Sequence, residues 1–234
     1  MRLLDTAERA IKAYGGADRW RRAEAIELRV SAGGLAFRMK AQPAFRAMAV
    51  RIEIAEPRVR LAPPGWGGVV GVLDGRSCRL EGPDGGVIAR REDPRAKFPH
   101  GRRLLWWDRL DQTYFSGYAL WNYVTFPRLL LREDIAWREE RVGLLEATFP
   151  DHLPTHSAVQ RFHFDPLSGL LLQHDYTAEV FGGWAKAANV VLQHGAADGV
   201  PYPSRRRVTP RRRSGAPAPF PTLVWIELDD LKFL

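Results

Sequence analysis

The sequence predicts a mainly β (α+β) protein, and three patterns in its 234 residues support this fold class. Runs in which apolar and polar residues alternate with a period of two fill much of the first ninety residues and return after residue 134. Between them, the segment Leu104–Tyr123 carries aromatic residues at helical spacing. The stretch 155–183 holds two alternating runs joined by Asp165-Pro166-Leu167-Ser168-Gly169, a connection of hairpin length. We therefore expect an antiparallel meander with one inserted helix.

The chain begins with a short amphipathic helix, expected over Leu3–Tyr14, where apolar residues recur at helical spacing. Gly15-Gly16 ends it, because glycine readily adopts the left-handed conformation of a helix cap. One more turn is expected at Asp18-Arg19-Trp20 before the first strand.

Period-two alternation then places the strands. We expect them at Ile26–Val30, Leu35–Lys40, Arg46–Ala55, Arg58–Leu61, Val69–Leu73, Arg76–Glu81, Val87–Arg91, Ile135–Glu140, Gly143–Phe149, Ala185–His194, Ser204–Pro210 and Leu223–Leu228. Turns or loops are expected at 31–34, 63–68, 201–203 and 214–221. Neither a repeat nor a linker divides the sequence, so we expect a single domain over residues 1–234.

The inserted helix presents one aromatic stripe, which consists of Trp107, Leu110, Tyr114, Tyr118 and Trp121. Such a stripe must be buried, most simply across an open sheet. Gly117 weakens the helix by about 1 kcal/mol relative to Ala, which suits either a kink or a point of close packing. We expect Pro127 to stop the helix.

The hairpin predicts a polar cluster on one strand face. If Phe164 pairs with Leu170, then Phe162 faces Leu172 and Gln160 faces His174. That face is apolar at the turn and becomes polar and aromatic farther away, where it carries His156, Gln160, His174 and Tyr176. A one-residue slip would change the pairs but not each strand's own alternation.

Composition excludes several classes of protein. The single cysteine, Cys78, permits neither a disulfide framework nor a cysteine metal site and fits a reducing cytoplasm. We find no secretory signal and no apolar run of 18 residues, so we expect a cytoplasmic protein without a transmembrane segment. P-loop, GxSxG and Rossmann fingerprints are missing, and we expect no cofactor.

The net charge of +8 invites a nucleic-acid interpretation. Much of the excess lies in Arg205-Arg206-Arg207 and Arg211-Arg212-Arg213. No aromatic residues alternate with these triplets, as a base-stacking platform would need. We therefore expect no nucleic-acid partner.

The N-terminal string Ala10-Ile11-Lys12-Ala13-Tyr14-Gly15-Gly16-Ala17-Asp18-Arg19-Trp20, followed by Ile26, resembles the opening of many LolA-like proteins. That superfamily includes lipoprotein carriers, mycobacterial lipid-binding lipoproteins and the violacein-pathway enzyme VioE. The resemblance implies a strongly curved, unclosed antiparallel sheet, a half-barrel, whose concave face is plugged by helices. No motif allows catalytic residues to be carried over from VioE.

Two groups of residues are candidates for a site. In the first, His174 or His156 would act as a base and Tyr176 or Tyr118 as a hydrogen-bond donor. Its structural alternative is an interior hydrogen-bonded network, since an unpaired buried polar group costs about 1–3 kcal/mol. A metal site is disfavoured because no HxH, HExxH or CxxC spacing occurs.

The second candidate lies on the aromatic helix, where Asp108 and Asp111 are three residues apart, as paired acid/base carboxylates could be. Its alternative is an exposed pair of carboxylates near Arg103 and Arg109. The residues expected to line a ligand cavity are Trp107, Tyr114, Trp121, Asn122, Gln160 and Phe162.

These observations lead to two hypotheses about function. The first is a cofactor-independent acid/base enzyme of secondary metabolism, an isomerase, cyclase or lyase, acting on an apolar or aromatic small molecule. The second is a non-catalytic carrier of lipid or another hydrophobic ligand. The sequence does not identify the substrate. It is compatible with a homodimer.

Overall fold

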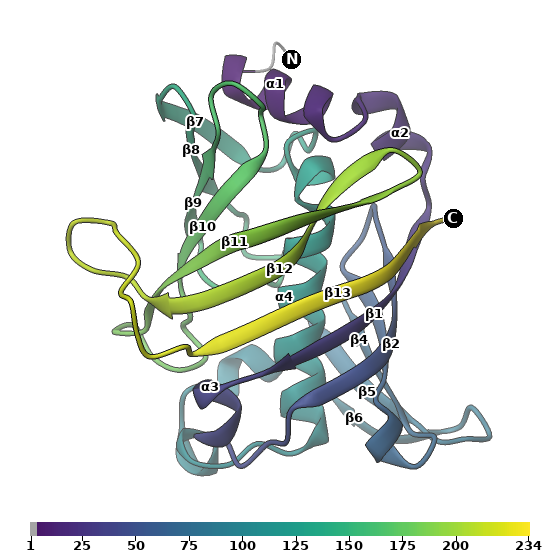
Figure 1. Ribbon diagram of the computed structural model, residues 1–234. Coiled ribbons are helices and arrows are strands. Elements are labelled where there is room, and N and C mark those ends of the chain that lie inside the picture. Colours follow the sequence, from purple (N-terminus) through teal and green to yellow (C-terminus); the bar gives the residue numbers. More distant parts are fainter. Residues whose placement is uncertain (1–3) are drawn as a thin grey trace.

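The computed structural model describes residues 4–234, and its strands form one antiparallel sheet that does not close into a barrel. The strand order is β6-β5-β4-β3-β2-β1-β13-β12-β11-β10-β9-β8-β7. The first and last strands along the chain, β1 and β13, therefore pair in the middle, and β6 and β7 form the edges. The predicted half-barrel is confirmed (Figure 1).

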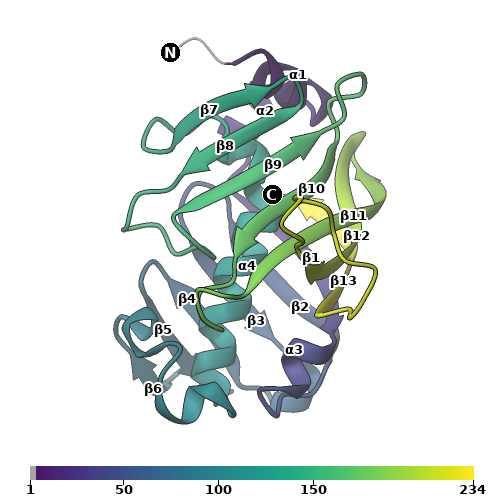
Figure 2. The same ribbon diagram turned by 90° about the vertical axis from the view of Figure 1, so that its left-hand side faces the viewer.

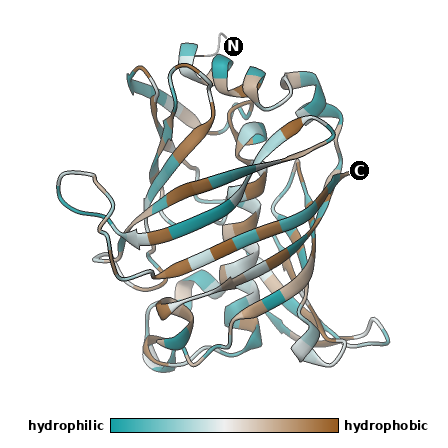
Figure 3. Cartoon of the chain, viewed as in Figure 1, coloured by the Kyte–Doolittle hydropathy of each residue, from teal (hydrophilic) through white to brown (hydrophobic). Residues whose placement is uncertain are grey.

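Alternation along the chain produces most of these strands, and Figure 3 shows it along β13. One half of the sheet consists of β1 (Ala25–Gly33), β2 (Phe45–Glu53), β3 (Arg58–Ala62), β4 (Val70–Asp74), β5 (Ser77–Glu81) and β6 (Val87–Arg91). The other consists of β7 (Ala136–Arg141), β8 (Leu144–Thr148), β9 (Val159–Phe164), β10 (Leu171–Thr177), β11 (Lys186–Ala197), β12 (Val200–Pro210) and β13 (Val224–Phe233).

Helices cover the two open ends and fill the middle. They are α1 (Asp5–Ala13), α2 (Ala17–Arg22), α3 (Leu35–Arg38) and α4 (Arg109–Leu129), with 3-10 turns η1 (Pro64–Trp66), η2 (Pro94–Lys97) and η3 (Gly101–Leu104). In Figure 1, α1 and α2 lie at one end of the curved sheet and α3 at the other. The predicted N-terminal helix is confirmed from Asp5 on, whereas Leu3 lies outside the described residues.

The long helix α4 connects the edge strands β6 and β7 through the concave side of the sheet (Figure 2). It begins at a capping box in which Asp108 accepts from the backbone of Asp111 and Asp111 accepts from that of Asp108. The helix is buried on every side, because the two halves of the sheet curl around it. Burial of α4 therefore extends well beyond the one aromatic stripe that the sequence predicts.

Gly117 is a point of close packing and not a kink. A Cβ atom there would lie 2.8 Å from the Cβ of Leu73 on β4. One turn earlier, Thr113 lies against Gly71 of the same strand, where a Cβ would meet its hydroxyl at 2.3 Å. Glycine on both partners thus lets α4 approach β4 closely.

Five expectations about elements were wrong, namely the turn at 31–34, the strand at 35–40, the loop at 201–203, the start of the long helix and its stop at Pro127. Residues 31–33 continue β1, and Leu35–Lys40 contains α3 instead of a strand, because Gly34, at φ +131°, turns the chain out of the sheet. The segment 201–203 belongs to β12 and not to a loop. Its prolines are tolerated because β12 registers with β13 only from Arg205 to Val208, which leaves residues 201–203 without a second neighbouring strand. Finally, α4 begins at Arg109 and passes Pro127.

The predicted hairpin forms, but its register was wrong. Phe164 pairs with Leu171, and His174 faces Phe162. A bulge between Leu171 and Gln173 shifts the register and turns Leu172 to the outside, where its side chain is exposed. The polar face nevertheless lies inside as expected. Over residues 4–234, no helix is both long and apolar enough to cross a bilayer.

Candidate functional site

The hydroxyl of Tyr123 lies at the centre of a buried polar network between α4 and the sheet. It is 2.7 Å from Nε2 of His156 and 2.6 Å from the hydroxyl of Tyr176. The rings of His156 and Tyr176 stack with their centroids 3.8 Å apart. One helix residue therefore fixes a loop residue just before β9 and a strand residue of β10.

A second hydrogen-bonded group begins at His174, whose Nε2 lies 2.6 Å from Oε1 of Gln160. The Gln160 amide donates to Thr155 and to the carbonyl of Ser157. Thr155 in turn donates to Oδ1 of Asn122 at 3.0 Å. The polar face of the predicted hairpin thus carries two hydrogen-bonded groups, one around Tyr123 and one around Gln160.

Burial keeps these groups uncharged at neutral pH. It lowers the pKa of His156 and of His174 well below the ordinary value of 6.5, because an imidazolium loses its water there. For the same reason it raises the pKa of Tyr123 to about 12 and that of Tyr176 well above 10.0. Each of these neutral side chains makes at least one hydrogen bond.

An apolar cavity of about 230 Å³ adjoins this network. His156, Tyr176 and Phe115 form its inner wall, and Val208, Val224 and Ala187 continue the wall along the sheet. Its mouth lies between α3 and the turn after β10, where Met39, Trp184 and Lys186 are exposed. A hollow of about 40 Å³ lies next to it and shares Phe115, Tyr176 and Val224.

One nitrogen of the His156 side chain has no hydrogen-bond partner among the described residues. Nδ1 of His156 is buried and makes no hydrogen bond among the described residues. Because Nε2 of the same ring is bonded to Tyr123, Nδ1 is the free position, and it donates or accepts according to the tautomer. The cavity lining itself is mostly apolar, and Lys186 and Arg211 are its charged residues.

The predicted catalytic residues divide between the cavity and other places. His156 and Tyr176 border it, whereas His174 is fully buried and stacks on Phe162 with ring centroids 4.1 Å apart. Tyr118 is fully buried, its ring centroid lies 5.0 Å from that of His156, and its hydroxyl has no partner within residues 4–234. Burial raises its pKa well above 10.0.

Asp111 lies in a separate cluster at the start of α4. Its carboxylate is fully buried and contacts Arg91 at 2.5 Å, Arg102 at 2.6 Å and Arg103 at 2.6 Å. Arg91 also binds Asp108, whose pKa falls to about 2. The two carboxylates hold the helix start and do not face the histidines.

The residues that the sequence predicts as cavity walls lie outside the cavity. Trp107 packs between Phe98, Phe115 and Phe181, and the indole of Trp121 donates to the carbonyl of Glu53 at 3.1 Å. Asn122, Gln160 and Phe162 belong to the buried network. Tyr114 borders a polar cleft of about 280 Å³ that also contains Arg76, Arg95, Asp151 and Glu179.

Sequence reasoning missed Tyr123, Phe181, Trp184 and Arg206. Tyr123 lies off the expected stripe, and only the enclosure of α4 from all sides makes it central. Arg206 belongs to a run interpreted as surface charge, but Arg205 points outward to Glu227 and Arg206 points inward. The alternation of strand residues was the signal that could have shown this.

A groove on the outer face of β1, β2 and β13 has a volume of about 650 Å³, which is larger than that of the cavity. Charged residues such as Glu27, Arg51 and Arg60 line it, and Arg51 pairs with Glu27 at 2.9 Å. Its open, ion-paired surface offers an apolar ligand little contact. Among residues 4–234, no three His, Cys, Asp or Glu side chains gather as a metal site would need.

The whole chain is similar in structure to a LolA superfamily protein from Nitrosomonas europaea, with a TM-score of 0.55 and 11% identity, over 99% of this chain and 94% of that one. The fold is LolA-like. A DUF1329 family protein from Desulfovibrio piger also matches, with a TM-score of 0.51 and 13% identity, over 97% of this chain and 91% of that one. The sequence matches no protein-family model and no curated protein.

The resemblance of the N-terminal string to LolA-like proteins is therefore confirmed at the level of the fold. Within this LolA-like sheet, the cavity beside His156 combines a mostly apolar wall with an open mouth. It is the candidate site.

Proposed function

We propose that this protein binds a small apolar or aromatic molecule, or a single acyl chain, in the cavity beside His156. The main supporting observation is a mostly apolar pocket with an open mouth inside a LolA-like sheet. Its volume of about 230 Å³ is below the roughly 300–1,000 Å³ of sites for drug-sized ligands. The part of the ligand that the cavity encloses is therefore small and mostly apolar.

The LolA-like fold supports a carrier role, which is what the resemblance to carriers and lipid-binding proteins implies. The buried network supports it further, because the hydroxyl of Tyr123 already engages His156 and Tyr176, the two network residues that border the cavity. Non-catalytic binding of a hydrophobic ligand is accordingly the function that we favour.

The acid/base enzyme of secondary metabolism remains the second proposal, and it depends on His156 and Tyr176, which border the cavity. A general base acts best when its pKa is near the working pH, and burial lowers that of His156 far below this. Conversion of a bound compound that is lost in His156→Gln, with affinity kept within about tenfold, would establish the enzyme instead.

The binding proposal is tested by titrating the protein with the fluorescent fatty acid cis-parinaric acid. Ala187→Leu adds volume at the cavity wall, and we expect it to weaken binding by about tenfold or more, because one methylene is already worth about 0.8 kcal/mol of burial. Ala49→Leu, on the exposed outer face of β2, is the matched control and should leave affinity unchanged. If both variants keep the melting temperature of the wild type and bind cis-parinaric acid with equal affinity, then the cavity is not the binding site.

A further inference from the structure

Large apolar side chains are exposed together around the cavity mouth. We call this surface the mouth rim, and it consists of Leu35, Met39, Leu105, Trp106, Trp184 and Phe220. The exposed fraction reaches 73% for Trp184, 77% for Phe220 and 78% for Leu105. Exposed apolar patches of this kind mark sites of contact with proteins or membranes.

Hydrogen bonds place the segments of the mouth rim next to one another. The start of α3 is attached to the segment before β13, since Leu35 and Ala36 donate to the carbonyls of Thr222 and Leu223. The end of α3 is attached to the segment before α4, since Nζ of Lys40 donates to the carbonyls of Arg103 and Leu104. Met39 and Trp184 meet at the cavity mouth.

The rim segments are strongly basic. Residues 35–42, 98–107, 181–186 and 211–222 contain no Asp or Glu and eight Lys or Arg, namely Arg38, Lys40, Arg102, Arg103, Lys186, Arg211, Arg212 and Arg213. Their charge of +8 equals the net charge of the whole chain. Arg102, Arg103 and Arg211 pair with carboxylates.

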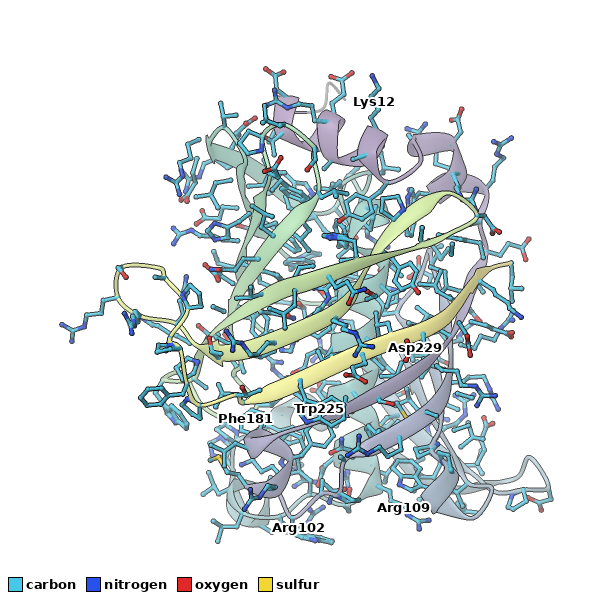
Figure 4. All side chains as sticks on the ribbon, in the orientation of Figure 1. Lys12, Arg102, Arg109, Phe181, Trp225 and Asp229 are labelled. Carbon is cyan, nitrogen blue, oxygen red and sulfur yellow. The ribbon has the colours of Figure 1, made fainter. Side chains whose placement is uncertain are left out.

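Four of these cations face solvent at the rim without a carboxylate partner among residues 4–234: Arg38, Lys186, Arg212 and Arg213. Figure 4 shows Arg102 and Phe181 near the lower end of the molecule, while Lys12 lies at the upper end. Exposed tryptophan, phenylalanine and free positive charge thus occur on the segments around the cavity mouth, of which the loop between β12 and β13 lies half-way up the side of the molecule (Figure 1).

We propose that the mouth rim docks onto the surface of an anionic lipid bilayer. Tryptophan suits the level of the lipid headgroups, and basic side chains are attracted to anionic lipids. A second copy of this chain fits less well, because a two-fold contact through this surface would set like charges against each other. The proposal does not require an occupied cavity.

The test is co-sedimentation of the full-length protein with vesicles of phosphatidylcholine alone or with about one-third phosphatidylglycerol. We expect partitioning onto the anionic vesicles to be about tenfold stronger, and to fall several-fold between low and high salt, because surface charge is screened. Trp184→Ser/Phe220→Ser and Arg212→Gln/Arg213→Gln should each reduce it by about tenfold or more.

Each variant has a matched control at another part of the surface. Leu167→Ser removes a side chain that is 96% exposed in the turn after β9. Arg9→Gln/Lys12→Gln removes two exposed charges from α1, at the opposite end from Arg102 (Figure 4). Both controls should bind vesicles as the wild type does.

Several results would overturn membrane docking. One is that the wild type does not bind anionic vesicles at low salt, and another is that rim and control variants lose vesicle binding equally. A third is that light scattering shows a dimer which Trp184→Ser dissociates. Ala187→Leu separates this proposal from ligand binding, because it should lose cis-parinaric acid while keeping vesicle binding. A wild type that binds cis-parinaric acid but no vesicles would contradict the docking proposal alone.

Discussion

Arg206 donates a hydrogen bond from Nη2 to the backbone carbonyl of Tyr123 at 2.7 Å, deep inside the molecule. In an uninterrupted helix, that carbonyl would accept from the backbone N–H four residues later. The residue there is Pro127, which has no N–H. The arginine replaces the missing donor, and its guanidinium also lies 5.0 Å from the centroid of the Tyr123 ring. A buried cation thus allows α4 to continue past its proline.

The pairing of Arg206 with a proline-exposed carbonyl predicts a coupling between residues 206 and 127. Arg206→Met leaves the carbonyl unpaired, which costs about 1–3 kcal/mol in the free energy of unfolding. Pro127→Ala restores an N–H at that position, so the cost of Arg206→Met should fall by about the same amount. A urea-denaturation cycle of the four proteins measures this coupling.

Arg205→Met is the control for that cycle, since Arg205 pairs with Glu227 on the outer face. Its cost should be the same with Pro127 and with Ala at 127. Arg206 does not replace the missing helix donor if the double variant Arg206→Met/Pro127→Ala loses as much free energy of unfolding as the two single variants together.

The buried histidines predict a loss of stability in mild acid. Because folding lowers the pKa of His156 and of His174, the unfolded chain binds protons below pH 6.5 that the folded chain does not. The free energy of unfolding should be fully present above this pH. As the pH falls it should decrease by up to about 1.4 kcal/mol per pH unit for each histidine.

Urea denaturation between about pH 7 and 5 measures this slope. Removing a buried histidine, as in His174→Gln, should flatten the slope, while His100→Gln, which changes an exposed residue, should not. A wild-type slope that stays near zero through this range would show that the imidazoles are protonated in the folded protein.

The arginine cluster around Asp111 predicts a structural and not a catalytic role for that carboxylate. Asp111→Asn weakens three contacts to arginine and the capping box, and we expect it to lower the free energy of unfolding by about 1–3 kcal/mol. Affinity for cis-parinaric acid should not change, because Asp111 is not part of the cavity wall. Denaturation and titration of the same variant separate the two roles, and loss of affinity without loss of stability would contradict this assignment.

Local patterns were sufficient for the features that one strand or helix determines by itself. Alternation predicted the inward direction of Gln160, His174 and Tyr176, because side chains on a strand point to opposite faces in turn. It failed at Leu172, since the bulge beside it adds a residue to β10 that no sequence signal announced.

Features that depend on several distant segments could not be predicted in this way. The cavity mouth forms where α3, the turn after β10 and the segment before β13 meet, and only the pairing of β1 with β13 brings them together. Tyr123 became central for a related reason, since the sheet encloses α4 and leaves it no solvent face. These outcomes follow from the way the open sheet curls around α4 and not from any local periodicity.

Photolabelling with a long-chain fatty acid that carries a diazirine at its tail tests the central claim most directly, because mass spectrometry then identifies the residues that the buried tail touches. The account predicts adducts on cavity residues such as Phe115, Ala178 and Phe181, which decrease in Ala187→Leu. Adducts confined to the outer groove around Arg51 and Arg60, and unchanged in that variant, would contradict it.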